Sequence, residues 1–274
     1  QRVHSLVSYM TEKGISRELP VAGLLSNGQT ALELLLGGMY GGFQVLLANP
    51  LSGRDILAYV IEHSETKILF VDNHYQELAE QALSKLSNKP EIILSQSDNS
   101  PAWNDTVPIK EMLYHAPKPK DKSLLIYTSG TTGRPKGVIH THESLLFGGW
   151  NTEVAHEITT DDVSLCVLPL CHINAQVVSV MGTLVNGSGL VMPQRFQASK
   201  FWFWMVDQKC TWFSAVPTIL SYLMNIEEGE KIKSKLGRVR FGRSASAALP
   251  PLRKISNPAS AARGWLVETI PFKA

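Results

Sequence analysis

Residues 127–138 hold a dense run of groups that can bind an oxyanion, with the sequence YTSGTTGRPKGV. Glycines let the chain turn tightly and approach a ligand closely, and free backbone N–H groups and hydroxyls donate hydrogen bonds to phosphate oxygens. Lys136 adds a positive charge. The run is not a Walker loop, because the fifth residue after Gly130 is Pro135 rather than the glycine of a Gly-Lys pair. It predicts a polyphosphate-binding loop formed by Thr128, Ser129, Gly130, Thr131, Thr132, Gly133 and Lys136.

Two predicted elements would hold this loop in place. The apolar run 124–127 before it is typical of a buried strand. After it, we expect a helix opened either by Thr141 with Ser144 or by His142 with Glu143.

The loop resembles that of the adenylate-forming superfamily, which includes acyl-CoA synthetases, luciferases and the adenylation domains of peptide synthetases. The resemblance implies that the loop holds the β- and γ-phosphates of ATP while a carboxylate attacks the α-phosphate. It also implies that Lys136 takes part in catalysis and that Thr128 lies beside Mg²⁺.

A second group of candidates follows the predicted strand 163–168, in the stretch PLCHINAQ at 169–176. Open α/β sheets build sites just past the carboxyl ends of their strands. In adenylate-forming enzymes a similar Leu-Pro-Leu-x-His stretch lies at the mouth of the acyl pocket. The resemblance implies that His172 shapes this site as a catalytic and substrate residue, with Asn174 as a further substrate contact.

Small residues follow another predicted strand, 238–242, in the stretch RSASAALP at 243–250. Such residues let a flat ring lie against the backbone. A similar turn carries adenine in the superfamily, which implies that Ser246, Ala247 and Ala248 border the adenine and Ala245 the acyl group.

The last residues match the superfamily less well. Its members have a Tyr-Gly-x-Thr-Glu run here, whereas this chain has Trp265 one place off the tyrosine and Val267 in place of the threonine. The resemblance implies that Glu268 holds Mg²⁺ and takes part in catalysis, because a hard carboxylate suits a hard cation. Trp265 and Thr269 complete the nucleotide-binding candidates.

Composition narrows the class of protein. The chain has 274 residues, 44% hydrophobic and 18% charged, with a net charge of +2, so it has no charge excess that favours nucleic acid or an anionic membrane. Its three cysteines lack metal-type spacing and suit a reducing, cytoplasmic compartment. The first residues lead into no apolar run, so we expect no signal peptide here. The glycine-containing apolar stretch 31–48 predicts a core helix packed closely on a neighbour rather than a stable membrane span.

Strand and helix patterns alternate along the chain, which predicts an α/β fold of mostly parallel sheets sandwiched by helices. We expect two subdomains, 1–120 and 121–274, the second carrying the phosphate loop. The resemblance implies the large N-terminal domain of an adenylate-forming enzyme, incomplete here, with the C-terminal lysine-bearing domain absent. The expected strands and helices are, in order, 21–25, 30–42, 43–47, 54–63, 67–71, 75–86, 91–94, 124–127, 163–168, 176–184, 190–192, 199–208, 211–215, a helix opened by 216–218, and 238–242.

The resemblance predicts an acid–CoA ligase that uses ATP, Mg²⁺ and coenzyme A to activate a small carboxylic acid. Without the lysine-bearing domain, the chain alone is expected to be a weak catalyst. Two alternatives stay open: a non-catalytic remnant that binds nucleotide or a partner, and a carrier-protein-directed adenylation domain. The identity of the acid is open, and a bare sheet edge leaves a homodimer open too.

Overall fold

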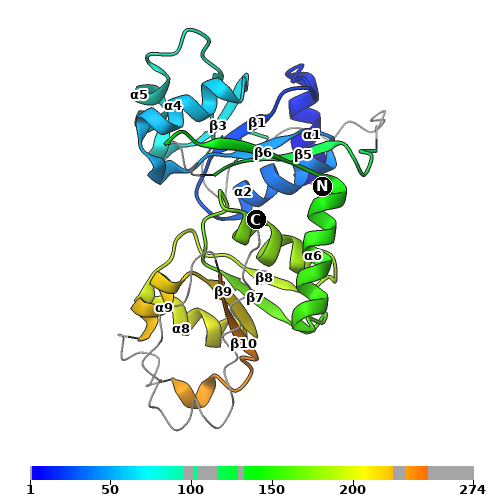
Figure 1. Cartoon of the computed structure of the whole chain (residues 1–274), viewed down its shortest axis with the longest axis vertical. Coiled ribbons are helices and arrows are strands. Elements are labelled where there is room, and N and C mark those ends of the chain that lie inside the picture. The colour runs from blue at the N-terminus through cyan, green and yellow to red at the C-terminus, as the bar shows by residue number, and fades with distance from the viewer. Residues whose placement is uncertain (1, 96–100, 104–115, 129–132, 225–231, 246–274) are drawn as a thin grey trace. The chain divides into compact units, whose positions relative to one another are not determined.

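The structure is a computed structural model that describes residues 2–95, 101–103, 116–128, 133–224 and 232–245. The chain divides into two compact units, and each is described by itself. The first comprises Gln1–Leu145 with Pro169–Cys171, and the second comprises Leu146–Leu168 with His172–Ala274. Figure 1 labels the elements.

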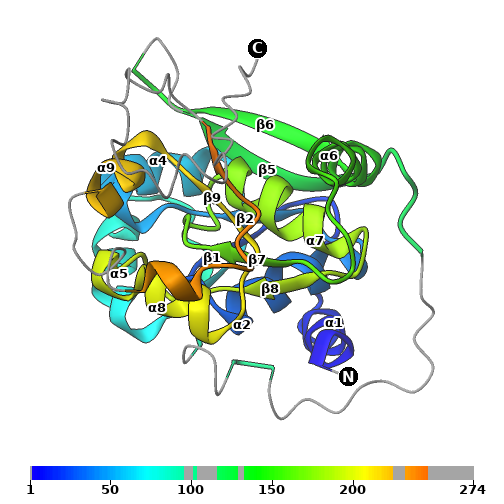
Figure 2. The ribbon, with the colours of Figure 1, turned by 90° about the horizontal axis from the view of Figure 1, so that it is seen from below.

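The first unit is built on a six-stranded sheet with the order β4-β3-β1-β2-β5-β6. Its neighbouring strands are parallel except for β5 and β6, which pair antiparallel and lie side by side in Figure 2. The mostly parallel α/β fold is confirmed, but β6 was not expected, because the sequence predicted that the loop passes directly into a helix. The strands are β1 (Val21–Leu24), β2 (Val45–Leu47), β3 (Ile68–Asp72), β4 (Glu91–Ser95), β5 (Lys122–Thr128) and β6 (Lys136–Thr141).

Helices connect these strands. The N-terminal helix α1 lies outside every predicted element, and the predicted helix 30–42 is a continuous helical stretch with a π-helical turn in its middle. The helices are α1 (Arg2–Glu12), α2 (Gln29–Leu32), π-helix η1 (Glu33–Gly37), α3 (Gly38–Tyr40), 3₁₀-helix η2 (Pro50–Ser52), α4 (Arg54–His63), 3₁₀-helix η3 (Asn73–Tyr75) and α5 (Gln76–Leu83).

Gly37, Gly38 and Gly41, in and directly after η1 and α3, allow close packing on α1 and β2. A Cβ atom built on Gly37 would lie 2.9 Å from Leu6 of α1, and one on Gly41 would lie 2.8 Å from Val7 of the same helix. One on Gly38 would lie 2.6 Å from Val45 of β2. The prediction of a core helix is confirmed. Within the described part of the chain, no helix is both long and apolar enough to cross a membrane.

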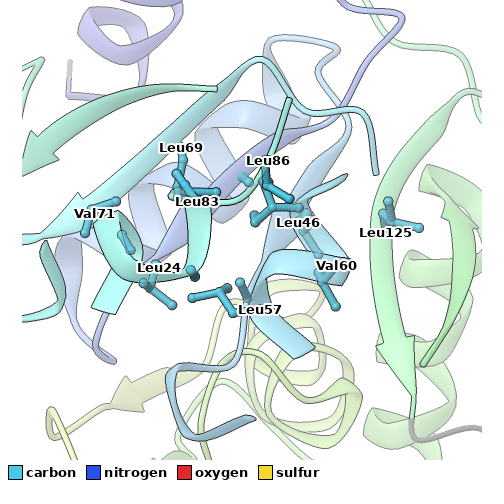
Figure 3. Close-up of a cluster of buried hydrophobic side chains, with 14 residues drawn as sticks. Leu24, Leu46, Leu57, Val60, Leu69, Val71, Leu83, Leu86 and Leu125 are labelled. Atoms are coloured by element: carbon cyan, nitrogen blue, oxygen red, sulfur yellow. The ribbon is translucent and has the colours of Figure 1, made fainter. Parts of the chain in front are cut away.

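A cluster of buried aliphatic side chains holds α4 and α5 against the first sheet (Figure 3). Leu57 and Val60 come from α4, Leu83 comes from α5, and Leu24 and Leu69 come from the strands. Burying such side chains removes apolar surface from water, which is the main force that stabilises a fold of this kind.

The second unit contains a four-stranded parallel sheet with the order β10-β9-β7-β8. The ring of Trp212 stacks on that of Phe241, and both pack with Ile158 and Val178 in a buried cluster. The elements are β7 (Val163–Cys166), π-helix η4 (Asn174–Met181), α7 (Gly182–Leu184), β8 (Gly189–Val191), α8 (Ala198–Asp207), β9 (Trp212–Ala215), α9 (Pro217–Met224), 3₁₀-helix η5 (Lys233–Lys235) and β10 (Phe241–Ser244).

Helix α6 (His142–His156) joins the two units, because its residues up to Leu145 belong to the first and those from Leu146 to the second. Thr141 Oγ1 accepts a hydrogen bond from the backbone N–H of Ser144, and Ser144 Oγ accepts one from that of Thr141. This reciprocal cap satisfies N–H groups that have no partner within the helix. It is the first of the two predicted helix starts.

The division between the units differs from the predicted boundary at residue 120. Strands β5 and β6 pair into the first sheet, so the chain between 121 and 145 belongs to the first unit. The segment around the predicted phosphate loop therefore belongs to the first unit and not to the second.

Candidate functional site

The predicted phosphate loop connects the two strands of the β5–β6 hairpin. Thr128 lies directly opposite Lys136 at the end of the hairpin, and both side chains are exposed. Antiparallel pairing thus places the hydroxyl of Thr128 and the ammonium group of Lys136 next to each other at the start and end of the loop. Of the loop itself, Ser129, Gly130, Thr131 and Thr132 lie outside the described residues.

Side chains from α4 contact this hairpin close to its loop end. The hydroxyl of Tyr127 lies 2.7 Å from Nδ1 of His63, and the guanidinium of Arg134 lies 5.7 Å from the ring centre of Tyr59. Burial, together with the nearby Tyr59, raises the pKa of Tyr127 to about 12, so its hydroxyl stays protonated at neutral pH. These contacts fix both ends of the loop to the first unit.

The described part of the loop fits a polyphosphate. Gly133 has a φ of +88°, a backbone conformation that favours glycine, and a Cβ atom there would meet nothing within 4 Å. Lys136 forms no ion pair with any described residue. An exposed cation without a carboxylate partner beside an open backbone turn can receive phosphate oxygens.

The second set of candidates begins at the N-terminal end of η4 in the second unit. The carbonyl oxygen of His172 accepts hydrogen bonds from the backbone N–H groups of Ala175 and Gln176, so it opens the helical turn. The side chain of His172 reaches the surface, but the protein around it lowers the pKa of its imidazole by desolvation. A neutral imidazole at pH 7 can donate and accept hydrogen bonds at an acid-binding site.

Asn174 lies two residues further on and is buried in a polar cluster with two residues of the sheet. Its Oδ1 accepts hydrogen bonds from Ser214 Oγ of β9, at 2.9 Å, and from Arg243 Nη1 of β10, at 3.0 Å. Arg243 Nη1 also lies 3.2 Å from Ser214 Oγ. Desolvation lowers the pKa of Arg243. The cluster lies near the carboxyl ends of β9 and β10, where parallel sheets place their ligands.

Ala245, the predicted acyl contact, is buried directly after β10, and its backbone N–H donates to the carbonyl of Ala215. Ala245 lies two residues after Arg243 along the chain, and Asn174 likewise lies two residues after His172. The other predicted contacts of the second unit are outside the described residues; they are Ser246, Ala247, Ala248, Trp265, Glu268 and Thr269.

The structure describes one of the two predicted Mg²⁺ ligands. Thr128 is described and exposed, whereas Glu268 is outside the described residues. Within the described ranges no group of three or more histidine, cysteine, aspartate or glutamate side chains could hold a metal ion. Of the two predicted ligands, the structure thus describes Thr128 alone.

All three cysteines are free, and burial raises the pKa of each thiol: to about 11 for Cys166 and to about 12 for Cys171 and Cys210. A raised pKa favours the neutral thiol, and the thiolate is the reactive form.

We therefore expect Ellman's reagent to modify the native protein slowly at pH 8, and faster only as the pH approaches these raised pKa values. Absorbance at 412 nm measures the reaction. In denaturant, where burial is lost, all three thiols should react at the rate of free cysteine. A thiol that reacted at that rate in the native protein at pH 8 would contradict this expectation.

Sequence reasoning missed the residues that support these candidates. Arg243 was placed only at the start of a small-residue turn, and Ser214 only within a strand. In the structure Arg243 lies inside β10, between Gly242 and Ser244, whereas the predicted strand ends at Gly242. No local signal links His63 with Tyr127, which lies 64 residues further along the chain.

Known proteins are similar to this chain in sequence and in fold. The chain is 38% identical to a sulfoacetate–CoA ligase of Cupriavidus necator, in a match that covers 87% of this chain and 46% of the relative. It is 29% identical to an oxalate–CoA ligase of Arabidopsis thaliana, over 71% of this chain and 39% of the relative. The ATP-bound crystal structure of MatB from Rhodopseudomonas palustris has the same fold, with a TM-score of 0.79 and 24% identity, over 90% of this chain and 48% of that chain.

The chain thus spans less than half of the length of these three proteins. A model of the AMP-binding enzyme family matches residues 1–254, which include the hairpin, His172 and the buried polar cluster. The chain belongs to the AMP-binding enzyme family, and its fold is that of the N-terminal domain of adenylate-forming enzymes.

Proposed function

We propose that this chain is the ATP- and acid-binding part of an acid–CoA ligase. In the proposed reaction a carboxylate oxygen of the acid attacks the α-phosphorus of ATP, and the bond to pyrophosphate breaks. The thiol of coenzyme A then attacks the acyl-adenylate, and AMP leaves. Family membership supports this function, as does the similarity to ligases named for sulfoacetate and oxalate, both of them small acids.

The observation that carries the proposal is the pairing of Thr128 with Lys136 at the open end of the hairpin. Lys136 would offset the negative charge of the departing pyrophosphate, and the hydroxyls and N–H groups of the loop would donate to its oxygens. The contact of Tyr127 with His63 and that of Arg134 with Tyr59 position the described residues on either side of the loop.

The remaining roles rest on the family resemblance. His172, Asn174 and Ala245 would contact the acid. Mg²⁺, held by Glu268 with Thr128 nearby, would offset phosphate charge when bound. The nucleotide itself would contact Ser246, Ala247, Ala248, Trp265 and Thr269.

Replacing Lys136 with alanine should weaken ATP binding by about tenfold or more, because a hydrogen bond to a charged group is worth roughly 1.5–3 kcal/mol. Lys122 is the matched control, because it is an exposed lysine at the opposite end of the same hairpin, where it faces Thr141. Lys122→Ala should leave the affinity within about twofold, the range of an ordinary surface substitution. Isothermal titration with ATP and Mg²⁺ measures both affinities at fixed ionic strength.

Equal affinities in the wild type and in Lys136→Ala would contradict the proposed role of the loop. Equal losses in the two variants would point instead to general attraction of ATP by positive charge. Exchange of labelled pyrophosphate into ATP then tests the chemistry, with sulfoacetate and oxalate as the first acids.

A further inference from the structure

Arg243 is a buried cation whose hydrogen-bond partners are neutral. The residue is 4% exposed, and Nη1 donates to the amide oxygen of Asn174 and to the hydroxyl of Ser214. Its Nε is fully buried and has no hydrogen-bond partner among the described residues. Burial thus removes the guanidinium from water, and the described residues supply no negative charge to compensate, which is unfavourable.

A second arginine close to β10 has the negative partner that Arg243 lacks among the described residues. Arg240, three residues earlier, forms an ion pair with Asp162. Arg243 forms no ion pair with any residue that the structure describes. The described residues therefore neutralise the charge of the more exposed Arg240 but not that of the buried Arg243.

Within the described part of the chain, the cluster around Arg243 has N–H groups without an acceptor, whereas Oδ1 of Asn174 and Oγ of Ser214 already accept hydrogen bonds. Both Ser214 Oγ and Arg243 Nη1 donate to Oδ1 of Asn174, which fixes the orientation of the amide. The other amide atom, Nδ2, is buried and has no partner among the described residues. Unused N–H groups on a guanidinium and an amide suit an anion, and the planar guanidinium suits a carboxylate or a sulfonate in particular.

The position of the cluster connects it with the acid. Asn174 lies two residues after His172, and Arg243 lies two residues before Ala245. His172, Asn174 and Ala245 are the proposed acid contacts. An alkyl chain placed against this cluster would leave the guanidinium and the amide unpaired, so the site would reject such an acid. An acid with a second negative group would pair them.

We propose that Arg243 and Nδ2 of Asn174 bind a second anionic group of the acid. The substrate is then a compact acid with two negative groups, one carboxylate to be activated and a further carboxylate or sulfonate, rather than a fatty acid. This inference rests on the proposed function and adds the class of acid to it.

Malonate and butyrate form a suitable pair of probes, because they are similar in size and differ in the second charge. Isothermal titration of the 274-residue chain, with AMP present and at constant ionic strength, should show malonate binding at least about tenfold more tightly than butyrate. In Arg243→Met this preference should fall to about twofold or less, through a loss of malonate affinity alone. Sulfoacetate should behave as malonate does.

Two further variants separate recognition from stability. Arg240→Met removes an equal charge from the same region and should lower the melting temperature while it keeps the preference for malonate. Asn174→Asp places a carboxylate beside Arg243 inside the chain, so it should abolish the preference while the melting temperature stays equal or rises. If Arg243→Met does not fold, Asn174→Asp still tests whether the cluster binds the second anionic group.

An equal affinity for malonate and butyrate in the wild type would overturn the inference, as would a preference that survives Arg243→Met or Asn174→Asp. The absence of binding by either acid would overturn it too. ATP binding and its dependence on Lys136 are measured separately, so a failure of the proposed function would be seen there and not in the ratio of the two acids.

Discussion

Replacing Asp162 with alanine should lower the free energy of unfolding by about 3 kcal/mol, the low end of the range for a broken buried ion pair. Asp162 is almost fully buried, and its carboxylate accepts from Thr211 Oγ1 at 2.6 Å, from the backbone N–H of Thr159 at 2.8 Å and from Nη1 of Arg240. Alanine would leave all three donors without their acceptor. The effect stays at the low end because the side chain of Arg240 is 38% exposed and can be partly hydrated.

Urea unfolding followed by circular dichroism measures this change. The matched control is Asp161→Ala, which removes an exposed carboxylate at the neighbouring position and should change stability by no more than about 0.5 kcal/mol. If the two substitutions had the same effect, the charge at this turn and not the buried network would be what stabilises it.

Replacing Gly149 with alanine should destabilise the protein by about 2 kcal/mol, although the same change usually stabilises an exposed helix by about 0.5–1 kcal/mol. Gly149 lies in α6, and a Cβ atom there would lie 2.7 Å from the carbonyl oxygen and 2.8 Å from the carbonyl carbon of Met181, in η4. Because these are backbone atoms, a rotamer change cannot relieve the clash, and α6 and η4 would have to move apart.

Gly237→Ala is the control for this prediction, because a Cβ atom there meets nothing within 4 Å. It should leave the free energy of unfolding within about 0.5 kcal/mol of the wild type. A stabilising effect of Gly149→Ala would show that α6 and η4 do not pack as closely in solution as in the structure.

Much of the architecture could be predicted from local patterns. Short apolar runs indicated the strands around residues 21, 68 and 212, and the structure has strands there because each run is long enough to cross a buried sheet. The run YTSGTTGRPKGV predicts a phosphate loop from residue types alone, and the family match includes the run; residues 129–132 lie outside the described part, so the loop stays a prediction. The packing role of the glycines in η1 and α3 was predicted correctly too, because their four-residue spacing places them on one face.

The pairing of distant segments was decided only by the tertiary structure. Strand β6 lies where the sequence predicts that the loop passes directly into a helix, yet it pairs with β5 and so moves the boundary between the units from residue 120 to residue 145. Arg243 meets Asn174 across 69 residues, and Arg240 meets Asp162 across 78. A local pattern reports which face of an element is apolar, but it does not report which partner that element will have. The buried arginine that selects the acid in our proposal therefore becomes visible only when β9, β10 and η4 have been placed together.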